Sequence, residues 1–419
     1  MLQALIIAVA AACAGYLSHG DTLGDTAFSR LASAYSLVHH GTWVIGHDPD
    51  MPPNPCADFT VDKVEIDGKL YSTKPPLLPL MMAGEYWLAH HLLGWDLAER
   101  DDLRALLRVM VLTLVTLPYI LALLCFAAML RWLLPNPWLR VYLLFALAFG
   151  TQLIGFATHI DNHVPAAGML MAALWCALGP ATGHAPAHRW RFFGFGLAAG
   201  LVFTFDMPIT IFIVPPGLYL LYRFPRYAFT WGALGVLAPL AVHFGVMLAV
   251  TGSPLPVQMR PELYLYEASY WRNPTGLDAL CEPKSLYFFH MHVGRFGSFT
   301  LFPVLWFGIA GTLLAAFKRD TRCRGWVLAG LLAFLVLTLY YVLRTNNYGG
   351  AAYGFRWHIA AMPVLLLMGV PILRRVRRPW HWVVLLLLLA MSCYSAWECT
   401  RTPWGVHQEW TCRVFGTSY

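Results

Sequence analysis

Residues 374–378 read Arg-Arg-Val-Arg-Arg and separate two apolar segments, so the side on which this run lies decides the topology. Four more short gaps between apolar segments are also basic, at 131–140, 189–191, 223–226 and 318–324. The five gaps hold 14 of the 29 Lys and Arg residues and one acid, Asp320, whereas the other 21 acids lie in longer connections. Cytoplasmic loops of membrane proteins are enriched in Lys and Arg. The pattern therefore predicts a membrane protein with the basic gaps inside and the longer connections outside.

The chain contains eleven apolar segments, several of which are separated by these basic gaps. The chain is 58% hydrophobic and 12% charged, which is outside the usual range of a soluble domain. The segments approach the roughly 17–25 residues that a membrane-spanning helix needs, so we predict an all-α polytopic protein with about eleven transmembrane helices. The first is expected to be a retained helix, because it lacks the charged start and cleavage site of a signal peptide. The segments are 2–18, 105–130, 141–158, 164–179, 192–206, 208–222, 228–250, 299–317, 326–343, 359–373 and 380–396.

The longer connections are expected to cap a single membrane domain on its outer side. No internal repeat or low-complexity segment is visible. The basic excess lies in the inside loops, so no nucleic-acid partner is needed to explain it. The expected boundaries are a membrane domain at 1–396, with outer loops at 19–104 and 252–298, and an extracytoplasmic tail at 397–419.

The first outer loop is predicted to hold two surface helices joined by a Pro- and Asp-rich hairpin. Residues 25–40 repeat apolar side chains at helical spacing on one side. Residues 76–93 are long enough to span, but they contain Glu85, His90 and His91. A crossing there would also place the basic run 374–378 outside. We therefore expect this second helix to lie along the outer interface.

The outer cysteines suggest one disulfide. Cys399 and Cys412 are close in sequence within the expected outer tail, where disulfides can persist. We expect these two residues to pair. No paired-cysteine spacing of the kind that binds zinc is visible in the sequence.

Three charged residues of the outer segments are candidates for chemistry, since charge at the membrane boundary is costly unless it lines a cavity. Asp25 precedes the first surface helix, where it can cap that helix, act as a catalytic base, or do both. Lys74 precedes two prolines and is either a lysine that snorkels at the interface or an ammonium aimed at an anion. Arg356 follows the Gly-rich loop 346–354 and is either a lipid-headgroup anchor or a planar fork for phosphate.

Two tight turns add polar candidates. His159, Asp161 and His163 lie in one turn between two expected helices, where they could bind a metal, contribute to an active site or only hydrogen-bond the turn. Asp206 precedes Pro208 in the other turn, and a helix cap is the simpler interpretation there.

Four stretches of sequence carry a family resemblance. The run Gly68-x-x-Tyr71-Ser72-x-Lys74-Pro75-Pro76-Leu77-Leu78-Pro79 is the most specific. It is accompanied by an Asp before Ser29-Arg30, by Ala-Gly-Glu-Tyr-Trp at 83–87, and by Tyr-Trp-x-Asn-Pro-x-Gly at 270–276. With the loop that leads to Arg356, they make most of residues 20–363 resemble the GT-C integral-membrane glycosyltransferases. That superfamily includes protein O-mannosyltransferases, the lipid A aminoarabinose transferase and bacterial relatives.

The resemblance implies a reaction. A GT-C enzyme of this kind inverts the anomeric carbon as it moves a sugar from a polyprenyl-phosphate donor to an acceptor hydroxyl, here on the extracytoplasmic face of a bacterial inner membrane. The acceptor stays open and could be a lipid, a glycan or a protein. By resemblance Asp25 is the base, with Asp161 as a second catalytic carboxylate. The donor phosphate is assigned to Lys74, Arg356, Arg30 and Tyr71, and the remaining cavity to His159, His163, Asp62, Asp206 and Tyr348.

The sequence departs from the family pattern in three places. Thr73 stands where the aminoarabinose transferase pattern has an acid, and Arg295-Phe296 stands where relatives often have paired histidines. Both departures weaken the case for a bound divalent metal, so a metal stays possible but is disfavoured, and no cofactor is firmly implied. The spacing from Asp25 to the Ser-Arg pair is one residue longer than usual, which leaves Asp21 as an alternative base.

A transporter or flippase for a lipid-linked or anionic solute is the alternative function. Transporters place polar groups near the midplane and often show repeat symmetry. In this sequence ionisable residues avoid the centres of the expected helices, apart from His243 and Arg108, and no repeat is visible. The sequence therefore favours the enzyme.

Overall fold

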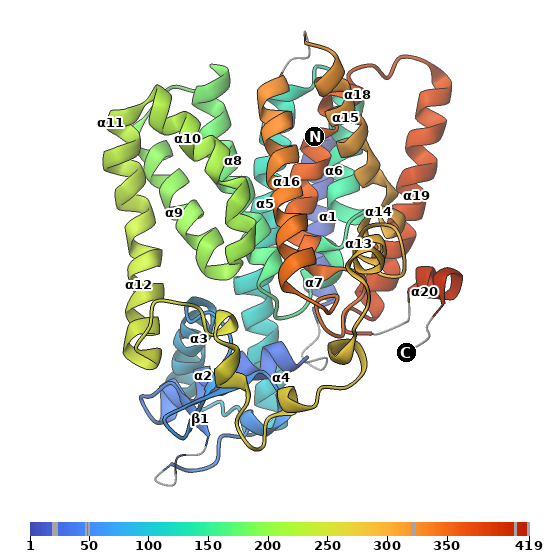
Figure 1. The fold of residues 1–419 in the computed structure, drawn as a ribbon. Helices are drawn as coiled ribbons and strands as arrows, with labels where there is room; N and C mark the ends of the chain where they lie inside the picture. Colours follow the sequence, from blue (N-terminus) through green and yellow to red (C-terminus); the bar gives the residue numbers. More distant parts are fainter. Residues whose placement is uncertain (19–23, 47, 49–50, 320–322, 406–408, 417–419) are drawn as a thin grey trace.

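The computed structural model describes residues 1–18, 24–46, 48, 51–319, 323–405 and 409–416. It is a bundle of long helices closed at one end by a smaller cap (Figure 1). A helix covers at least half of each of the eleven expected segments. The helices are α1 (Leu2–Tyr16), α5 (Leu117–Leu133), α6 (Pro137–Phe149), α8 (His163–Thr182), α9 (Arg189–Phe205), α10 (Val214–Arg223), α12 (Ala233–Thr251), α15 (Trp306–Phe317), α16 (Arg324–Arg344), α17 (Met362–Met368) with α18 (Val370–Leu373), and α19 (Pro379–Arg401).

Six of the described helical stretches are long and apolar enough to cross a membrane. Four shorter apolar helices accompany them, and the helix at Arg189–Phe205 is also short. Length and composition thus support a multi-pass protein, while the count of eleven crossings stays a prediction. The six are Arg100–Leu133, His163–Thr182, Pro225–Thr251, Arg324–Arg344, Arg356–Leu373 and Pro379–Arg401.

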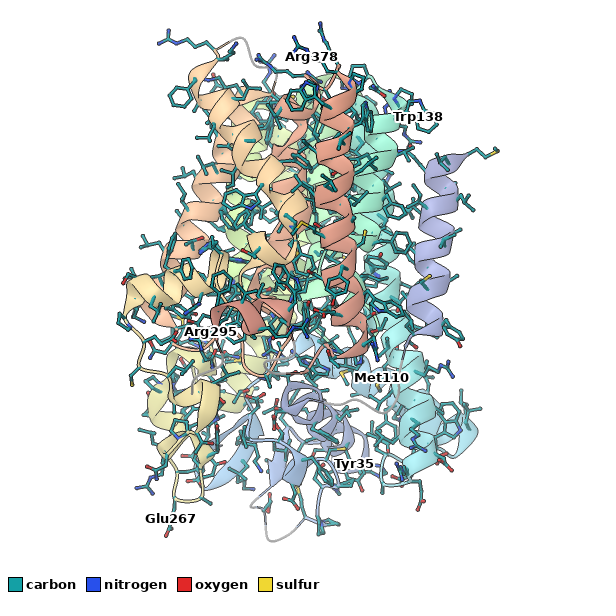
Figure 2. The ribbon with its side chains drawn as sticks, turned by 90° about the vertical axis from the view of Figure 1, so that its right-hand side faces the viewer. Tyr35, Met110, Trp138, Glu267, Arg295 and Arg378 are labelled. Carbon is teal, nitrogen blue, oxygen red and sulfur yellow. The ribbon has the colours of Figure 1, made fainter. Side chains whose placement is uncertain are left out.

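The basic gaps and the cap lie at opposite ends of the bundle. Figure 2 shows Arg378 and Trp138 at one end and Tyr35 and Glu267 at the other. The C-terminal ends of α8, α10, α15 and α18 lie at the end of the bundle opposite the cap (Figure 1). The charge asymmetry of the sequence is therefore an asymmetry of the folded molecule along the helix axes.

The cap is built from the first outer loop and is not purely helical. Helices α2 (Asp25–His39) and α3 (Leu77–Leu93) pack together beside a small antiparallel sheet of order β1-β3-β2. The strands are β1 (Val44–Gly46), β2 (Lys63–Ile66) and β3 (Lys69–Ser72), so the all-α expectation is wrong for this loop.

The turn from β2 to β3 explains the hairpin. Asp67 and Gly68 both have positive φ, at 52° and 77°, as the two central residues of a tight hairpin turn require, and glycine adopts this conformation without strain. The turn sets the register Val64↔Tyr71 and Glu65↔Leu70. The helix expected over 76–93 is present as α3 and lies in the cap (Figure 1).

The second long outer loop covers the hairpin. It consists of short 3₁₀ turns and α13 (Lys284–His292). The Trp271 indole donates to the Val61 carbonyl at 2.9 Å, and the Gln258 amide donates to the Thr73 carbonyl. These contacts hold the loop against the strand that leads to Lys74.

The segment after α19 folds back onto the bundle and ends in α20 (Trp410–Phe415). The Tyr353 amide donates to the Pro403 carbonyl at 2.9 Å, and the Gly354 amide donates to the Glu409 carboxylate at 2.7 Å. These two bonds fix the Gly-rich loop from its far side.

The expected disulfide is wrong, because Cys399 and Cys412 are both free thiols. α19 continues to Arg401, so Cys399 stays on the buried face of that helix against Gly155. Cys412 lies on α20, where its sulfur is 3.4 Å from a Glu409 carboxylate oxygen. The two cysteines therefore lie on different helices and are not bonded to each other.

Candidate active site between the cap and the bundle

Asp25 is the first residue of α2, but its side chain does not cap the helix. The N-cap position is Gly24, and no side chain makes a cap bond there. One Asp25 carboxylate oxygen instead accepts the Val61 amide at 3.3 Å, and the residue is exposed. The capping interpretation is therefore wrong, and the carboxylate is tethered yet accessible. The alternative base, Asp21, lies outside the described residues.

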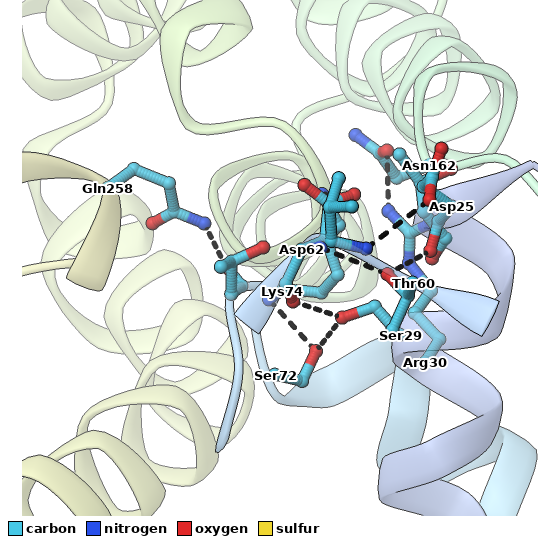
Figure 3. A network of polar contacts seen from close by, with 12 residues as sticks. Asp25, Ser29, Arg30, Thr60, Asp62, Ser72, Lys74, Asn162 and Gln258 are labelled. Atoms are coloured by element: carbon cyan, nitrogen blue, oxygen red, sulfur yellow. Dashed lines mark hydrogen bonds and ion pairs between the residues drawn. The ribbon is translucent and has the colours of Figure 1, made fainter. Parts of the chain in front are cut away.

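Lys74 belongs to a polar network that ties α2 to the end of β3 (Figure 3). The Ser29 hydroxyl donates to the Asp62 carbonyl at 2.7 Å and lies 2.6 Å from the Ser72 hydroxyl. The Lys74 ammonium is 2.7 Å from the Asp62 carboxylate, and its side chain is 15% exposed. Burial lowers the pKa of Lys74, and the Asp62 charge opposes that shift. Lys74 therefore turns inward to a counter-ion instead of snorkelling outward.

Arg30 joins the cap to the bundle. Its guanidinium donates to the Asn162 side chain at 2.7 Å and to the Thr26 carbonyl at 2.9 Å, and the residue is 2% exposed (Figure 3). Burial lowers the pKa of Arg30 to about 10, against the opposing charge of Asp161. Its hydrogen bonds give Arg30 a positioning role between α2 and the turn before α8.

Asp161 and the two turn histidines have partners within the protein. One Asp161 oxygen accepts the His163 and Val164 amides, each at 2.9 Å, and so satisfies the start of α8. His163 Nδ1 lies 2.6 Å from an Asp206 oxygen, and both residues are buried. His159 Nδ1 lies 2.7 Å from the Thr158 hydroxyl. The histidines thus face different partners.

Among the described residues, no three of these turn side chains come close enough together to share a metal ion. The Asp206 side chain also makes no cap bond at the helical turn that follows it, so the capping interpretation is wrong there too. Its carboxylate is used to pair with His163.

Arg356 differs from the other two cations. Within the part of the chain that the structure describes, no hydrogen bond or ion pair is found for its guanidinium, and its Nε is buried without a partner. Carboxylates nonetheless surround it at longer range. The four that act on it electrostatically are Asp161, Asp62, Asp278 and Asp206.

The Gly-rich loop brings its backbone close to the Arg356 side chain. A Cβ added at Gly349 would lie 2.9 Å from Arg356 Cγ, so a side chain there would displace the arginine stem. The glycine thus allows the loop backbone to contact the Arg356 side chain from one side.

Two residues of this region escaped the sequence analysis. Trp404 places its indole ring 5.3 Å from the Arg356 guanidinium carbon, and its Nε1 is buried without a hydrogen-bond partner among the described residues. Asp278 accepts the Asn347 amide at 2.7 Å, and burial raises its pKa. In the sequence, Asp278 and Trp404 are one acid and one tryptophan in aromatic-rich outer segments. Residue type and position of this kind do not predict which side chains they contact.

Tyr71 and Tyr348 lie in different surroundings. Tyr71 lies on β3 and lines a small, open hollow together with Ser72, Lys74 and the outer end of α12. Tyr348 is fully buried, stacks on Phe296 with ring centres 4.4 Å apart, and donates to the Glu282 carboxylate. Tyr71 could therefore contact a ligand that approaches from the side of α12. Tyr348 packs inside the protein and supports the Gly-rich loop.

Comparisons with known proteins establish the fold. No family model matches the sequence, and no curated protein matches it either. Solved structures do match. ArnT from Cupriavidus metallidurans in the apo state has a TM-score of 0.53 at 14% identity, over 92% of this chain and 61% of that one. The same protein bound to undecaprenyl phosphate gives 0.52 at 15%, over 93% and 62%.

An oligosaccharyltransferase has the same architecture. The Archaeoglobus fulgidus enzyme, in complex with Zn and sulfate, has a TM-score of 0.54 at 18% identity, over 97% of this chain and 54% of that one. This chain thus spans about three fifths of the length of ArnT and about half that of the oligosaccharyltransferase. The fold is that of the GT-C glycosyltransferases, and the resemblance seen in the sequence is confirmed at the level of fold.

Proposed function

We propose that this GT-C-fold protein is an inverting glycosyltransferase, which moves a sugar from a polyprenyl-phosphate donor to an acceptor hydroxyl. The observation that carries the proposal is the guanidinium of Arg356, which has no hydrogen-bond or ion-pair partner among the described residues and lies among carboxylates where the cap meets the bundle. Arg356 is half-buried and its Nε is enclosed without a hydrogen-bond partner among the described residues. A cation held this way carries a desolvation cost, and a phosphate ligand relieves that cost. The GT-C fold supports the same assignment.

The donor phosphate is assigned to Arg356. A guanidinium presents parallel N–H groups that match two oxygens of one phosphate. The buried Trp404 Nε1 lies beside it as a further unpaired donor. At an effective dielectric near 20, a unit charge at about 4 Å contributes roughly 4 kcal/mol, which is enough to favour both donor binding and departure of the phosphate.

Lys74 and Arg30 have a different role in this proposal. Lys74 is already paired with Asp62. Its ammonium therefore contributes positive potential near the phosphate, and it contacts the phosphate directly only if the ammonium interacts with Asp62 and the phosphate at the same time. Arg30 holds the Asn162 turn. Both cations interact electrostatically with Arg356, so a bound anion relieves the repulsion among the three.

Asp25 is assigned as the general base. It is exposed, whereas Asp161 is buried and already accepts two backbone amides. Asp25 takes the proton of the acceptor hydroxyl while the oxygen of that hydroxyl attacks the anomeric carbon. The bond from that carbon to the phosphate oxygen breaks on the opposite face, and polyprenyl phosphate leaves with the bonding electron pair. Asp161 supports the cations electrostatically.

The site is assigned to the extracytoplasmic face of a bacterial inner membrane. The cap that forms it lies at the opposite end of the bundle from Arg378 (Figure 2), and basic ends are cytoplasmic by the positive-inside rule. The same argument supports eleven crossings, because an odd number places the start of α1 inside and the segment after α19 outside.

Donor binding tests the proposal. The chain is reconstituted in nanodiscs, and undecaprenyl phosphate binding is measured by native mass spectrometry, followed by transfer assays with a panel of polyprenyl-phosphate sugars. We expect Arg356→Ala to lose binding at least about 10-fold and Arg356→Lys to retain part of it. Arg272→Ala, at an exposed arginine of the second outer loop, is the matched control. Wild-type binding by Arg356→Ala, or movement of the lipid across the bilayer without transfer, would contradict the proposal.

A further inference from the structure

His39, His90 and Asp96 form a cluster at the ends of α2 and α3 away from Asp25 and Lys74. Each side chain offers a potential ligand atom, these atoms lie within 4.8 Å of one another, and all three residues are half-buried. The His39 and His90 ring centres are 4.8 Å apart in an edge-to-face arrangement. Within the described residues this is the one group of at least three such side chains close enough to share an ion.

Hydrogen bonding fixes the tautomer of His90. Its Nδ1 lies 2.9 Å from the Trp95 carbonyl oxygen, and a carbonyl only accepts, so Nδ1 carries the hydrogen. The lone pair of Nε2 is then available as a ligand. Metal-binding histidines usually donate their second ring nitrogen to a carbonyl or carboxylate in this way.

Asp96 is also held in place by donors. One of its oxygens accepts the Ala98 amide at 2.9 Å, and the Tyr86 hydroxyl lies 3.5 Å from the same oxygen. That hydroxyl is 2.6 Å from His39 Nε2. If His39 binds an ion through Nε2, the Tyr86 hydroxyl no longer donates to that nitrogen. It can then donate to the Asp96 carboxylate and hold this ligand in place.

We propose that His39, His90 and Asp96 bind a divalent transition metal of the zinc class. Two imidazoles and one carboxylate suit zinc, with water in the fourth position, whereas calcium and magnesium prefer oxygen ligands only. Ligand atoms around a tetrahedral zinc lie about 3.4 Å apart, so small side-chain rotations close the cluster from its present spacing. The expectation that a metal is disfavoured at the catalytic residues is unaffected, because none of them belongs to this set.

The ion would hold together the two helices that lead to the catalytic residues. α2 begins at Asp25, and α3 follows Lys74 directly. The Ser29 and Ser72 hydroxyls connect the segments near those two residues, while His39 and His90 meet at the other ends. The helices therefore run side by side in the same direction, and a metal at their far ends fixes the angle between them.

Metal content tests this proposal without reference to activity. The full chain is purified with a tag that binds no metal, stripped with a chelator and dialysed against Zn²⁺, and zinc is counted by mass spectrometry. We expect one ion per chain, and a tetrahedral Co²⁺ visible spectrum when Co²⁺ replaces it. His90→Gln and His39→Gln should each weaken Zn²⁺ affinity about 100-fold. His91→Gln, at the exposed neighbour that lies outside the set, should leave it unchanged.

Melting curves show whether each variant folds and whether Zn²⁺ stabilises it. Zn²⁺ should raise the Tm of the wild type and of His91→Gln, and should not move that of His90→Gln or of Asp96→Asn, which keeps the shape of the side chain. Zinc-free Tm values close to wild type show that the variants fold. Failure of the stripped chain to bind Zn²⁺, or equal loss in His91→Gln, overturns the proposal and leaves an adventitious ion only.

Discussion

The Arg356 guanidinium carbon lies 5.3 Å from the centre of the Trp404 indole ring, and the same indole packs against Gly24, directly before Asp25. A Cβ added at Gly24 would lie 3.3 Å from that ring. One aromatic side chain therefore connects the candidate phosphate-binding residue to the candidate base, although the three positions are far apart in sequence.

Replacing Trp404 by leucine should impair transfer without unfolding the protein. The substitution removes a cation–π contact worth about 0.5–2 kcal/mol and the wall that orients Arg356. We expect kcat/KM to fall about 10-fold, with Trp404→Phe retaining most of it. Trp397→Leu, at an exposed tryptophan of α19, is the control in the same transfer assay. An unchanged rate in Trp404→Leu would show that the indole does not position Arg356.

Asp25→Asn should leave a folded protein with transfer activity reduced at least about 100-fold, the usual scale of a lost general base. The amide oxygen can still accept the Val61 amide, so the tether to the loop is kept. Activity and Tm are measured together. If Asp25→Asn remains active while Asp161→Asn or Asp21→Asn is inactive and folded, the role of base passes to that residue.

Lys74→Ala should lower stability because it leaves the Asp62 carboxylate largely buried without its counter-ion. The double variant Lys74→Ala with Asp62→Ala should recover most of the Tm, since neither charge is then uncompensated. It should not recover donor binding if the ammonium also contributes to the phosphate site. Recovery of both Tm and donor affinity in the double variant would show that Lys74 only neutralises Asp62 and does not contribute to donor binding.

Stability should fall as pH rises from about 4.5 to 7 because of Glu409. Burial raises the pKa of Glu409 from 4.5 to about 7, so over this range the folded state holds a proton that the unfolded state has released. Stability then decreases with pH across that window, by up to about 3 kcal/mol. Glu409→Gln should flatten the decrease in a pH series of melting curves, while Glu267→Gln, at an exposed glutamate of the second outer loop, should not. An identical pH dependence in Glu409→Gln contradicts the assignment.

Local signals in the sequence predicted the helices well. Runs of apolar residues bounded by basic gaps located the long helices, and the Pro- and Asp-rich composition between the two surface helices indicated the hairpin. The third strand of that sheet was missed, because β1 pairs with β3 across 22 intervening residues and has only three residues of its own. Short strands of this kind depend on their partners more than on their own pattern.

The candidate site was predicted in part. Asp25, Lys74 and Arg356 were chosen by family resemblance, and the electrostatic neighbours of Lys74 and Arg356 do overlap. The partners of these residues were not predictable, since Asp62, Asn162 and Trp404 come from separate loops whose contacts arise only on folding. The Cys399–Cys412 expectation failed for a similar reason, because distance along the chain says nothing about which face of α19 a residue occupies.

The position of Trp404 has a consequence for biogenesis. Membrane helices enter the bilayer in the order of synthesis, and Trp404 follows α19. An insertion intermediate that stops before α19 already contains Asp25, Lys74 and Arg356, but Arg356 lacks its indole support and the Gly-rich loop lacks Pro403 and Glu409. Under the proposed function, such an intermediate would transfer sugar far more slowly than the complete chain. A half-inserted chain would then consume little donor, and transfer activity would report complete insertion.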